Sequence, residues 1–352
     1  GCRGARGMSG PMTSNRPNIL WLCTDQQRWD TIGRLGNPHI ATPTLDALCA
    51  AGTAFDHAYT QSPICTPSRA SFLTGRYPAA HGVYRNGNEF WPAHETLVTK
   101  RLADAGYDCG LIGKLHLSAA KHYERRTDDG YRLFLWNHHP TPDAARGDAY
   151  EHWLRHEKKL DPQALYADKG AFCGPGVPAD VHQTTWCAEM AIRFITDRRQ
   201  GPWQLSVNFF DPHAPFDAPP EALAKVDPAS LPLPLWRDSD AARWRDFEAV
   251  DQQQKRPQDP RIRHPNQPPP PAARDHDKVA SHVPDNYDAL AVKANYYAMI
   301  QHIDAQVGRI LAALDASGQR ENTIVLFHSD HGELLGDHGL VLKGCRFFDG
   351  LV

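Results

Sequence analysis

The chain has 352 residues, 41% of them hydrophobic, which is enough apolar material for a substantial core in one large α/β domain or two smaller ones. Its formal net charge of −3 gives no reason to expect nucleic acid or an anionic membrane as a partner. No apolar run approaches the length of a membrane-spanning helix.

The first segment, residues 1–15, is small and polar and lacks the apolar core of a secretory signal. We therefore expect a disordered leader, with Met8 or Met12 as alternative starts, followed by one folded region over residues 16–352. The eight cysteines are irregularly spaced and none forms a Cys-x-x-Cys pair, which disfavours a disulfide framework and a zinc site. A reduced cytoplasm is the expected location, with the periplasm or secretion as the alternative if an upstream signal is missing.

The first predicted strand is the continuous apolar run at 18–23, typical of a central strand covered on both faces. It is followed by Asp25 and Gln26, and open α/β sheets bind ligands just beyond the carboxyl ends of their strands. Two oxygen-bearing side chains there suit a hard cation such as Ca²⁺ or Mg²⁺. The alternative for an isolated Asp-Gln pair is a solvated turn.

Next come a predicted short helix from Thr42 to its stop at Gly52, and a strand at 53–59. The stretch 64–76, Ile-Cys-Thr-Pro-Ser-Arg-Ala-Ser-Phe-Leu-Thr-Gly-Arg, then predicts a helix capped by Thr66 with Pro67 in its first position. Cys65 would stand at the helix N-terminus, where free N–H groups favour negative charge. Arg69, about one turn further on, can point back toward it. The alternative is an ordinary buried cysteine before a helix.

A predicted helix at 96–105 and a strand at 107–112 lead into Gly-Lys-Leu-His at 113–116. Strand alternation places Lys114 and His116 on one face, where a cation and an imidazole together can bind an oxyanion and move a proton. The alternative is an ordinary Lys and His at a strand end. Residues 118–176 predict a loop-rich insertion over the active-site face, in which His138 or His139 could touch substrate or simply lie on the surface.

Three further elements complete the sheet and its helices: a helix at 184–197, a strand at 203–209 and a long helix at 288–317. After the strand, prolines on both sides of His213 fix the loop backbone and hence the imidazole. Residues 251–285 are polar and proline-rich and predict an extended excursion. A buried strand at 322–327 then leads to Asp330 and His331, which could complete an oxygen-rich metal site with the pair after the first strand.

These motifs together resemble the type I, formylglycine-dependent sulfatases of the alkaline-phosphatase-like superfamily. The resemblance rests on Cys-x-Pro-Ser-Arg followed by Leu-Thr-Gly-Arg, on Gly-Lys-x-His, on Pro-His-x-Pro and on Asp-His, in the order of that family over roughly residues 17–350. It implies a three-layer α/β sandwich with a large mixed, mostly parallel central sheet, as expected from strands that alternate with helices.

The resemblance also implies hydrolysis of a sulfate monoester, on a small molecule or a carbohydrate. Cys65 would be oxidised to Cα-formylglycine by a formylglycine-generating or other sulfatase-modifying enzyme, and one divalent ion would be bound, Ca²⁺ first, with Mg²⁺ or Mn²⁺ as alternatives. The implied catalytic residues are Cys65, Arg69, Lys114, His116, His213 and Lys343. The implied metal ligands are Asp25, Gln26, Cys65, Asp330 and His331.

One position departs from the pattern, since the family often carries a second acid where this chain has Gln26, which lacks one negative charge. The Asp-Gln pair also occurs among phosphonate monoester and phosphodiester hydrolases of the same fold, which makes that activity the first alternative; the Gly-Lys-x-His element argues against it. A non-catalytic binding protein is the second alternative. Glu333, Asp337 and His338 are expected to support the site. Nothing after Val352 matches the smaller C-terminal subdomain of sulfatases, so we expect a truncated catalytic domain that exposes apolar surface.

Overall fold

The computed structural model describes residues 16–86, 91–118, 124–140, 147–169, 172–247, 287–344 and 349–352. Its centre is a five-stranded sheet in the order β3-β2-β4-β1-β5, in which every pairing is parallel. The strands are β1 (Asn18–Thr24), β2 (Asp108–Gly113), β3 (Leu133–Trp136), β4 (Trp203–Asn208) and β5 (Thr323–Ser329). The expected α/β fold class is confirmed. The predicted leader and the proline-rich excursion at 251–285 lie outside the described residues.

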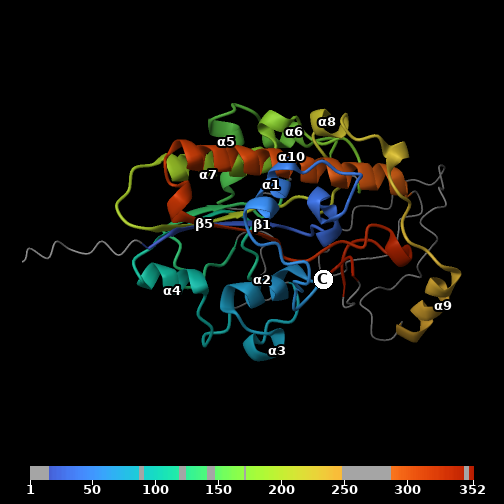
Figure 1. Ribbon diagram of the computed structural model, residues 1–352, viewed down its shortest axis with the longest axis horizontal. Coiled ribbons are helices and arrows are strands. Elements are labelled where there is room, and N and C mark those ends of the chain that lie inside the picture. The colour runs from blue at the N-terminus through green and yellow to red at the C-terminus, as the bar shows by residue number, and fades with distance from the viewer. Residues whose placement is uncertain are drawn as a thin grey trace, which may run out of the picture.

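Helices cover both faces of the sheet and make three layers (Figure 1). The upper layer in that view contains α1 (Pro43–Ala51), α5 (Ala149–His156), α6 (Pro162–Leu165), α7 (Gln183–Thr196), α8 (Pro220–Leu223) and α10 (Ala289–Ala316). The lower layer contains α2 (Cys65–Thr74), α3 (Pro78–His81) and α4 (Val98–Asp104), while α9 (Asp238–Phe247) lies apart from both.

Short 3₁₀ helices connect these elements: η1 (Trp29–Thr31), η2 (Gly33–Leu35), η3 (Ala179–Val181), η4 (Pro228–Ser230), η5 (Arg320–Asn322) and η6 (Asp337–Gly339). None of the helices that the structure describes is both long enough and apolar enough to cross a membrane.

The apolar run of β1 packs against both helical layers, which explains why it is continuous rather than alternating. Leu20 and Leu22 belong to the upper core with α7 and α10, whereas Trp21 packs on the lower core with Leu73 and Leu111. Successive side chains of a strand point to opposite faces, so a strand buried on both sides needs apolar residues at every position. The site is therefore built on a strand that is anchored from above and below.

One strand prediction fails, and the burial expected of a second strand is wrong. Residues 53–59 are exposed and form no strand, with Phe55 77% exposed, because alternation of residue types builds a strand only where a neighbour pairs with it. The strand predicted at 322–327 exists as β5, but it lies at an edge of the described sheet and is not fully buried. Ile324 and Leu326 on it are 47% and 43% exposed.

The signature helix and the insertion also differ in detail from expectation. Helix α2 starts at Cys65 itself, with Ile64 as N-cap and no side-chain cap, instead of being capped by Thr66. The N–H of Thr66 is bound by Asn86 Oδ1 at 3.0 Å. The predicted loop-rich region contains β3, α5 and α6. Asp148 caps α5 and accepts the N–H of Glu151 at 2.8 Å. An aspartate at this position is a sequence signal for a helix start, but the many histidines and aromatic residues nearby obscured it.

Candidate active site

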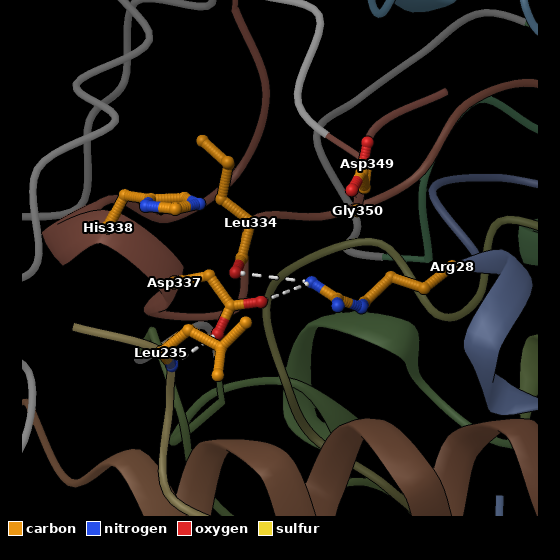
Figure 2. Close-up of a pocket in the computed structure, with 7 residues that line it drawn as sticks. All are labelled: Arg28, Leu235, Leu334, Asp337, His338, Asp349 and Gly350. Atoms are coloured by element: carbon orange, nitrogen blue, oxygen red, sulfur yellow. Dashed lines mark hydrogen bonds and ion pairs between the residues drawn. The ribbon is translucent and has the colours of Figure 1, made fainter.

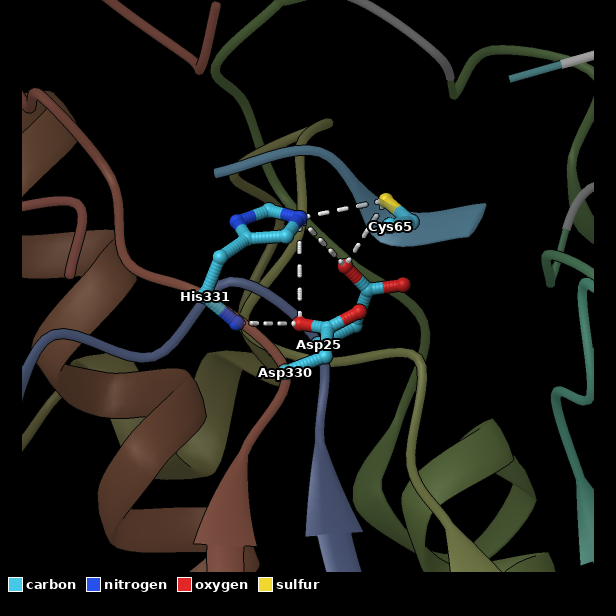
Figure 3. A group of neighbouring side chains, drawn as sticks. All are labelled: Asp25, Cys65, Asp330 and His331. Carbon is cyan, nitrogen blue, oxygen red and sulfur yellow. Dashed lines mark hydrogen bonds and ion pairs between the residues drawn. The ribbon is translucent and has the colours of Figure 1, made fainter. Parts of the chain in front are cut away.

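The parallel strands bring their carboxyl ends to one edge of the sheet, and the N-terminus of α2 meets them there (Figure 3). Asp25 follows β1, Asp330 and His331 follow β5, and Cys65 opens α2. One ligand atom from each of these four buried residues lies within 4.8 Å of all the others. Residues far apart in the sequence therefore form one compact cluster, which could hold a metal ion.

The imidazole of His331 has a defined orientation in this cluster. Its Nδ1 lies 2.8 Å from the carbonyl oxygen of Gly332, so the ring proton sits on Nδ1. The lone pair of Nε2 then faces Cys65 Sγ at 3.2 Å and Asp25 Oδ1 at 3.8 Å. Two carboxylates and a correctly oriented imidazole are a donor set that suits a divalent cation.

Arg69 contacts the cluster and is completely buried. Its Nε donates to Asp330 at 3.0 Å and its Nη2 to Asp25 at 3.3 Å. Its Nη1 donates to the carbonyl oxygen of Lys114 at 2.9 Å. The guanidinium therefore bridges the two carboxylates and the loop after β2, whereas the sequence predicted that it would point toward the thiol.

Two lysines add positive charge around the thiol. Lys114 Nζ forms a very short ion pair with Asp25 and lies 4.0 Å from Cys65 Sγ. Burial and the Asp25 charge act to raise the pKa of the Cys65 thiol, but the Lys114 and Lys343 charges prevail and hold that pKa below its usual value. Burial likewise opposes ionisation of Asp25, yet Lys114 holds the pKa of this carboxyl well below its ordinary value. The site is thus organised around negative charge at position 65.

His213 and Lys343 face each other across the site. His213 Nδ1 lies 2.6 Å from the carbonyl oxygen of Ala214, which leaves Nε2 to accept from Lys343 Nζ at 2.6 Å. Burial, followed by the Lys343 charge, holds the pKa of His213 well below its usual value. The imidazole is accordingly neutral, and Lys343 is the cation of the pair.

Gln26 lies next to the cluster, but its amide is bound to other side chains. Its Oε1 accepts from Lys343 Nζ at 2.7 Å, and its Nε2 makes a very short contact with Glu333. Its backbone N–H donates to Asp330 Oδ1 at 3.0 Å. Glu333 therefore binds the amide of Gln26, in line with the expectation that it supports the site. A carboxyl group thus lies next to position 26, where sulfatases often have a second acid, but does not occupy that position.

His116 occupies a different position from the one that strand alternation predicts. Strand β2 ends at Gly113, so the alternation does not extend to the loop that follows. The His116 ring packs edge-on against His138, with centroids 4.5 Å apart. Burial, then the charges of Lys114 and Arg69, hold the pKa of His116 well below its ordinary value. Glu124, which the sequence analysis missed, binds the backbone of this loop through its carboxylate.

A hollow of about 190 Å³ lies beside η6 and is lined by Arg28, Leu235, Leu334, Asp337, His338, Asp349 and Gly350 (Figure 2). Arg28 does not offer a free charge there. It binds both carboxylate oxygens of Asp30 at 2.8 Å, Asp337 at 3.0 Å and the carbonyl oxygen of Glu333 at 2.9 Å. This arginine cluster ties the segment after β1 to the segment after β5.

Comparison with known proteins agrees with this fold and site. The family described as Sulfatase matches residues 17–349. An arylsulfatase of Clostridium perfringens is 32% identical over 348 residues, covering 94% of this chain and 66% of that protein. The multifunctional alkaline phosphatase superfamily protein PehA of Trinickia caryophylli is 29% identical over 359 residues, covering 93% of this chain and 65% of that protein.

Among solved structures, the phosphonate monoester hydrolase of Agrobacterium radiobacter matches with a TM-score of 0.72 at 26% identity, covering 96% of this chain and 66% of that one. This chain thus spans just under two thirds of the length of these relatives. It belongs to the sulfatase family, within the alkaline phosphatase superfamily. The family resemblance drawn from the sequence motifs is confirmed.

Proposed function

We propose that this chain carries the catalytic site of a sulfate-monoester hydrolase. One observation carries the proposal: Cys65 stands at the start of α2, 3.2 Å from His331 Nε2 and 4.0 Å from Lys114 Nζ, in a buried group of potential metal ligands. A thiol held where negative charge is favoured suits conversion to Cα-formylglycine by a sulfatase-modifying enzyme. The substrate would be a small-molecule or carbohydrate sulfate ester, and residues 16–352 would form the main catalytic domain.

The residues present fit one divalent ion. Asp25, Asp330 and His331 Nε2 would hold it, together with position 65 and the amide oxygen of Gln26, which is an oxygen donor already facing Lys343. Such an ion, with Ca²⁺ as the first candidate and Mg²⁺ or Mn²⁺ as alternatives, would neutralise sulfate oxygens and lower the pKa of a hydroxyl at position 65. The formylglycine hydrate would supply that hydroxyl as nucleophile.

The other side chains have separable roles. Arg69 neutralises both carboxylates and fixes their direction. Lys114 and Lys343 supply positive charge to the sulfate oxygens as charge develops in the transition state. Lys343 shares a proton with the neutral His213 across 2.6 Å, so this pair is the candidate donor to the leaving oxygen. His116, kept neutral by burial and by Lys114, is the candidate base for the step that releases sulfate.

Phosphonate monoester or phosphodiester hydrolysis is the second candidate function. Gln26 favours it, because a metal bound here would have one anionic ligand fewer than in a site with a second acid. The carboxyl of Glu333 binds the Gln26 amide and would not contact the metal directly. The likeness to a phosphonate monoester hydrolase in structure points the same way. The Lys114 and His116 pair favours sulfate esters. A purely binding protein is the least favoured, since it would not need a buried lysine beside the thiol.

The test uses the longest natural form of the chain, coexpressed with a formylglycine-generating enzyme. Peptide mass analysis should find formylglycine at position 65. Specificity, as kcat/KM, should be higher for an aryl sulfate than for the matched phosphate and phosphonate esters. Cys65→Ala should fold, because it removes one small side chain, and should lose turnover. Active enzyme with only unmodified Cys65 would refute the proposal, and preference for the phosphonate ester would favour the second candidate.

A further inference from the structure

The loop after β2 carries two of the proposed catalytic side chains, Lys114 and His116, and it is anchored at Lys114 by its neighbours. The Lys114 carbonyl oxygen accepts from Arg69 Nη1 at 2.9 Å and from Asn208 Nδ2 at 2.7 Å. The Lys114 N–H donates to the Asn208 carbonyl oxygen at 3.0 Å. Gly113 runs so close to β4 that a Cβ there would lie 2.0 Å from that same oxygen. These contacts fix the first half of the loop.

The second half of the loop is bound by Glu124. Its Oε2 accepts the N–H of His116 at 2.9 Å. Its Oε1 accepts the N–H groups of Leu117 at 2.9 Å and Ser118 at 3.1 Å, and the Ser118 hydroxyl at 3.3 Å. Successive N–H groups that converge in this way form a concavity for an anion. A single buried carboxylate therefore satisfies three consecutive backbone donors.

The backbone at this point has an unusual conformation. His116 has a φ of 55°, in the left-handed region that residues with a Cβ rarely adopt. Such a conformation persists only where the surroundings hold it in place. Because the His116 side chain is 7% exposed and packed against His138, the direction of its ring follows from this turn. The contacts that fix this turn therefore also determine the direction of the imidazole ring.

We propose that Glu124 is a positioning residue that acts through His116, because it holds the left-handed turn and with it the direction of the imidazole, which packs against His138. The inference rests on the proposed function, because it assigns Glu124 to a turnover in which His116 takes part. It does not require Glu124 to touch substrate. Gln at this position would keep one acceptor oxygen but place an NH₂ group against the backbone donors, so the role requires an acceptor at both carboxylate oxygens.

The first experiment compares Glu124→Gln, His116→Ala and the double variant in the modified, metal-loaded enzyme on an aryl sulfate. We expect Glu124→Gln to lower kcat about tenfold or more with KM nearly unchanged, because a misdirected base slows a chemical step without weakening binding. The double variant should be no slower than His116→Ala alone. Multiplied losses in the double variant, or a normal kcat in Glu124→Gln, would overturn the proposal.

Asp129→Asn is the matched control. Asp129 is also a buried carboxylate on the segment after residue 124, but it accepts the N–H of Tyr131 at 2.9 Å and pairs with Arg126, away from the site loop. Its kcat should stay within about twofold of the wild type. If Glu124→Gln does not fold, Glu124→Asp takes its place. This variant keeps both acceptor oxygens but shortens their reach to the loop backbone, so it should lower kcat with KM nearly unchanged, and a normal kcat would overturn the proposal.

Amide hydrogen exchange tests the clamp independently of turnover. The N–H groups of His116, Leu117 and Ser118 should exchange about tenfold or more faster in Glu124→Gln and remain protected in Asp129→Asn. Unchanged exchange at these three residues would overturn the clamp. If the wild type hydrolyses no ester, the proposed function fails while the exchange experiment still decides whether Glu124 holds the turn.

Discussion

Two arginines, Arg69 completely buried and Arg28 partly buried, have the same arrangement of partners and different surroundings. Arg69 bridges Asp25 and Asp330, and Arg28 bridges Asp30 and Asp337; in each pair one acid follows β1 and the other follows β5. Around Arg28 the remaining donors go to the backbone, such as the carbonyl oxygen of Glu333. Around Arg69 two lysines add further positive charge close to the thiol of Cys65.

The difference separates a structural cluster from a reactive one. The Arg28 cluster has one arginine for two carboxylates and lies partly at the surface, with Asp30 36% exposed, so water can replace lost contacts. The Arg69 cluster is sealed, and its three cations, Arg69, Lys114 and Lys343, outnumber the two carboxylates that Arg69 bridges. Excess charge of one sign in a buried place is expected where a ligand of the opposite sign will bind.

The largest expected effect on stability comes from removing each arginine in turn. Arg69→Met leaves two completely buried carboxylates without their partner and should lower the free energy of unfolding by about 3–5 kcal/mol. Arg28→Met, whose partners reach water, should cost only about 1–2 kcal/mol. Urea denaturation of both variants measures the difference. Equal losses would contradict the distinction between a sealed cluster and a surface cluster.

The next effect concerns activity and uses a buried lysine near each cluster. Lys343→Met removes the donor that lies 2.7 Å from Gln26 Oε1 and should lower kcat/KM by about 10²–10³-fold, as for loss of one transition-state donor. Lys293, which donates to the Pro232 carbonyl oxygen at 2.6 Å and lies near the Arg28 cluster, is the control. Lys293→Met should leave kcat/KM within about twofold. Similar losses in both would mean that the second cluster also affects turnover.

The sequence correctly predicted the elements that follow from hydrophobic periodicity and the cluster of residues that follows from the order of the motifs. The continuous run of β1 and the helical spacing of α10 identify both elements, and the motifs correctly gathered Asp25, Cys65, Asp330 and His331. Their roles, like those of Arg69, Lys114, His116, His213 and Lys343, remain predictions for the experiments above.

What the sequence could not predict depends on contacts between distant segments. Glu124 and Arg28 stand in no motif, and their function becomes visible only when a loop backbone folds around each side chain. The failed strand at 53–59 has the same origin, because pairing is a property of the neighbour as well as of the segment. The turn at His116 likewise broke the alternation on which its placement had depended.

The smallest expected effect is the pH dependence of stability that Lys293 gives to the Arg28 cluster. Burial, opposed by Asp337, lowers the pKa of Lys293 from 10.5 to about 8. Lys293 therefore holds its proton less tightly in the folded chain, and between those two values the unfolded chain carries more protons. The free energy of unfolding should consequently rise with pH through this window, by about 3 kcal/mol at most.

Urea denaturation at pH 7.5 and at pH 10.5 should then show that the free energy of unfolding rises more in the wild type than in Lys293→Met, because methionine has no proton to lose. Taking the difference between wild type and variant removes the contribution of the cysteines and tyrosines that titrate in the same range. A difference that stays constant with pH would show that Lys293 is charged and solvated in the folded chain. A difference that moves the opposite way would mean that Asp30 and Asp337 hold the ammonium tightly, so that the Arg28 cluster, like the Arg69 cluster, depends on a second cation.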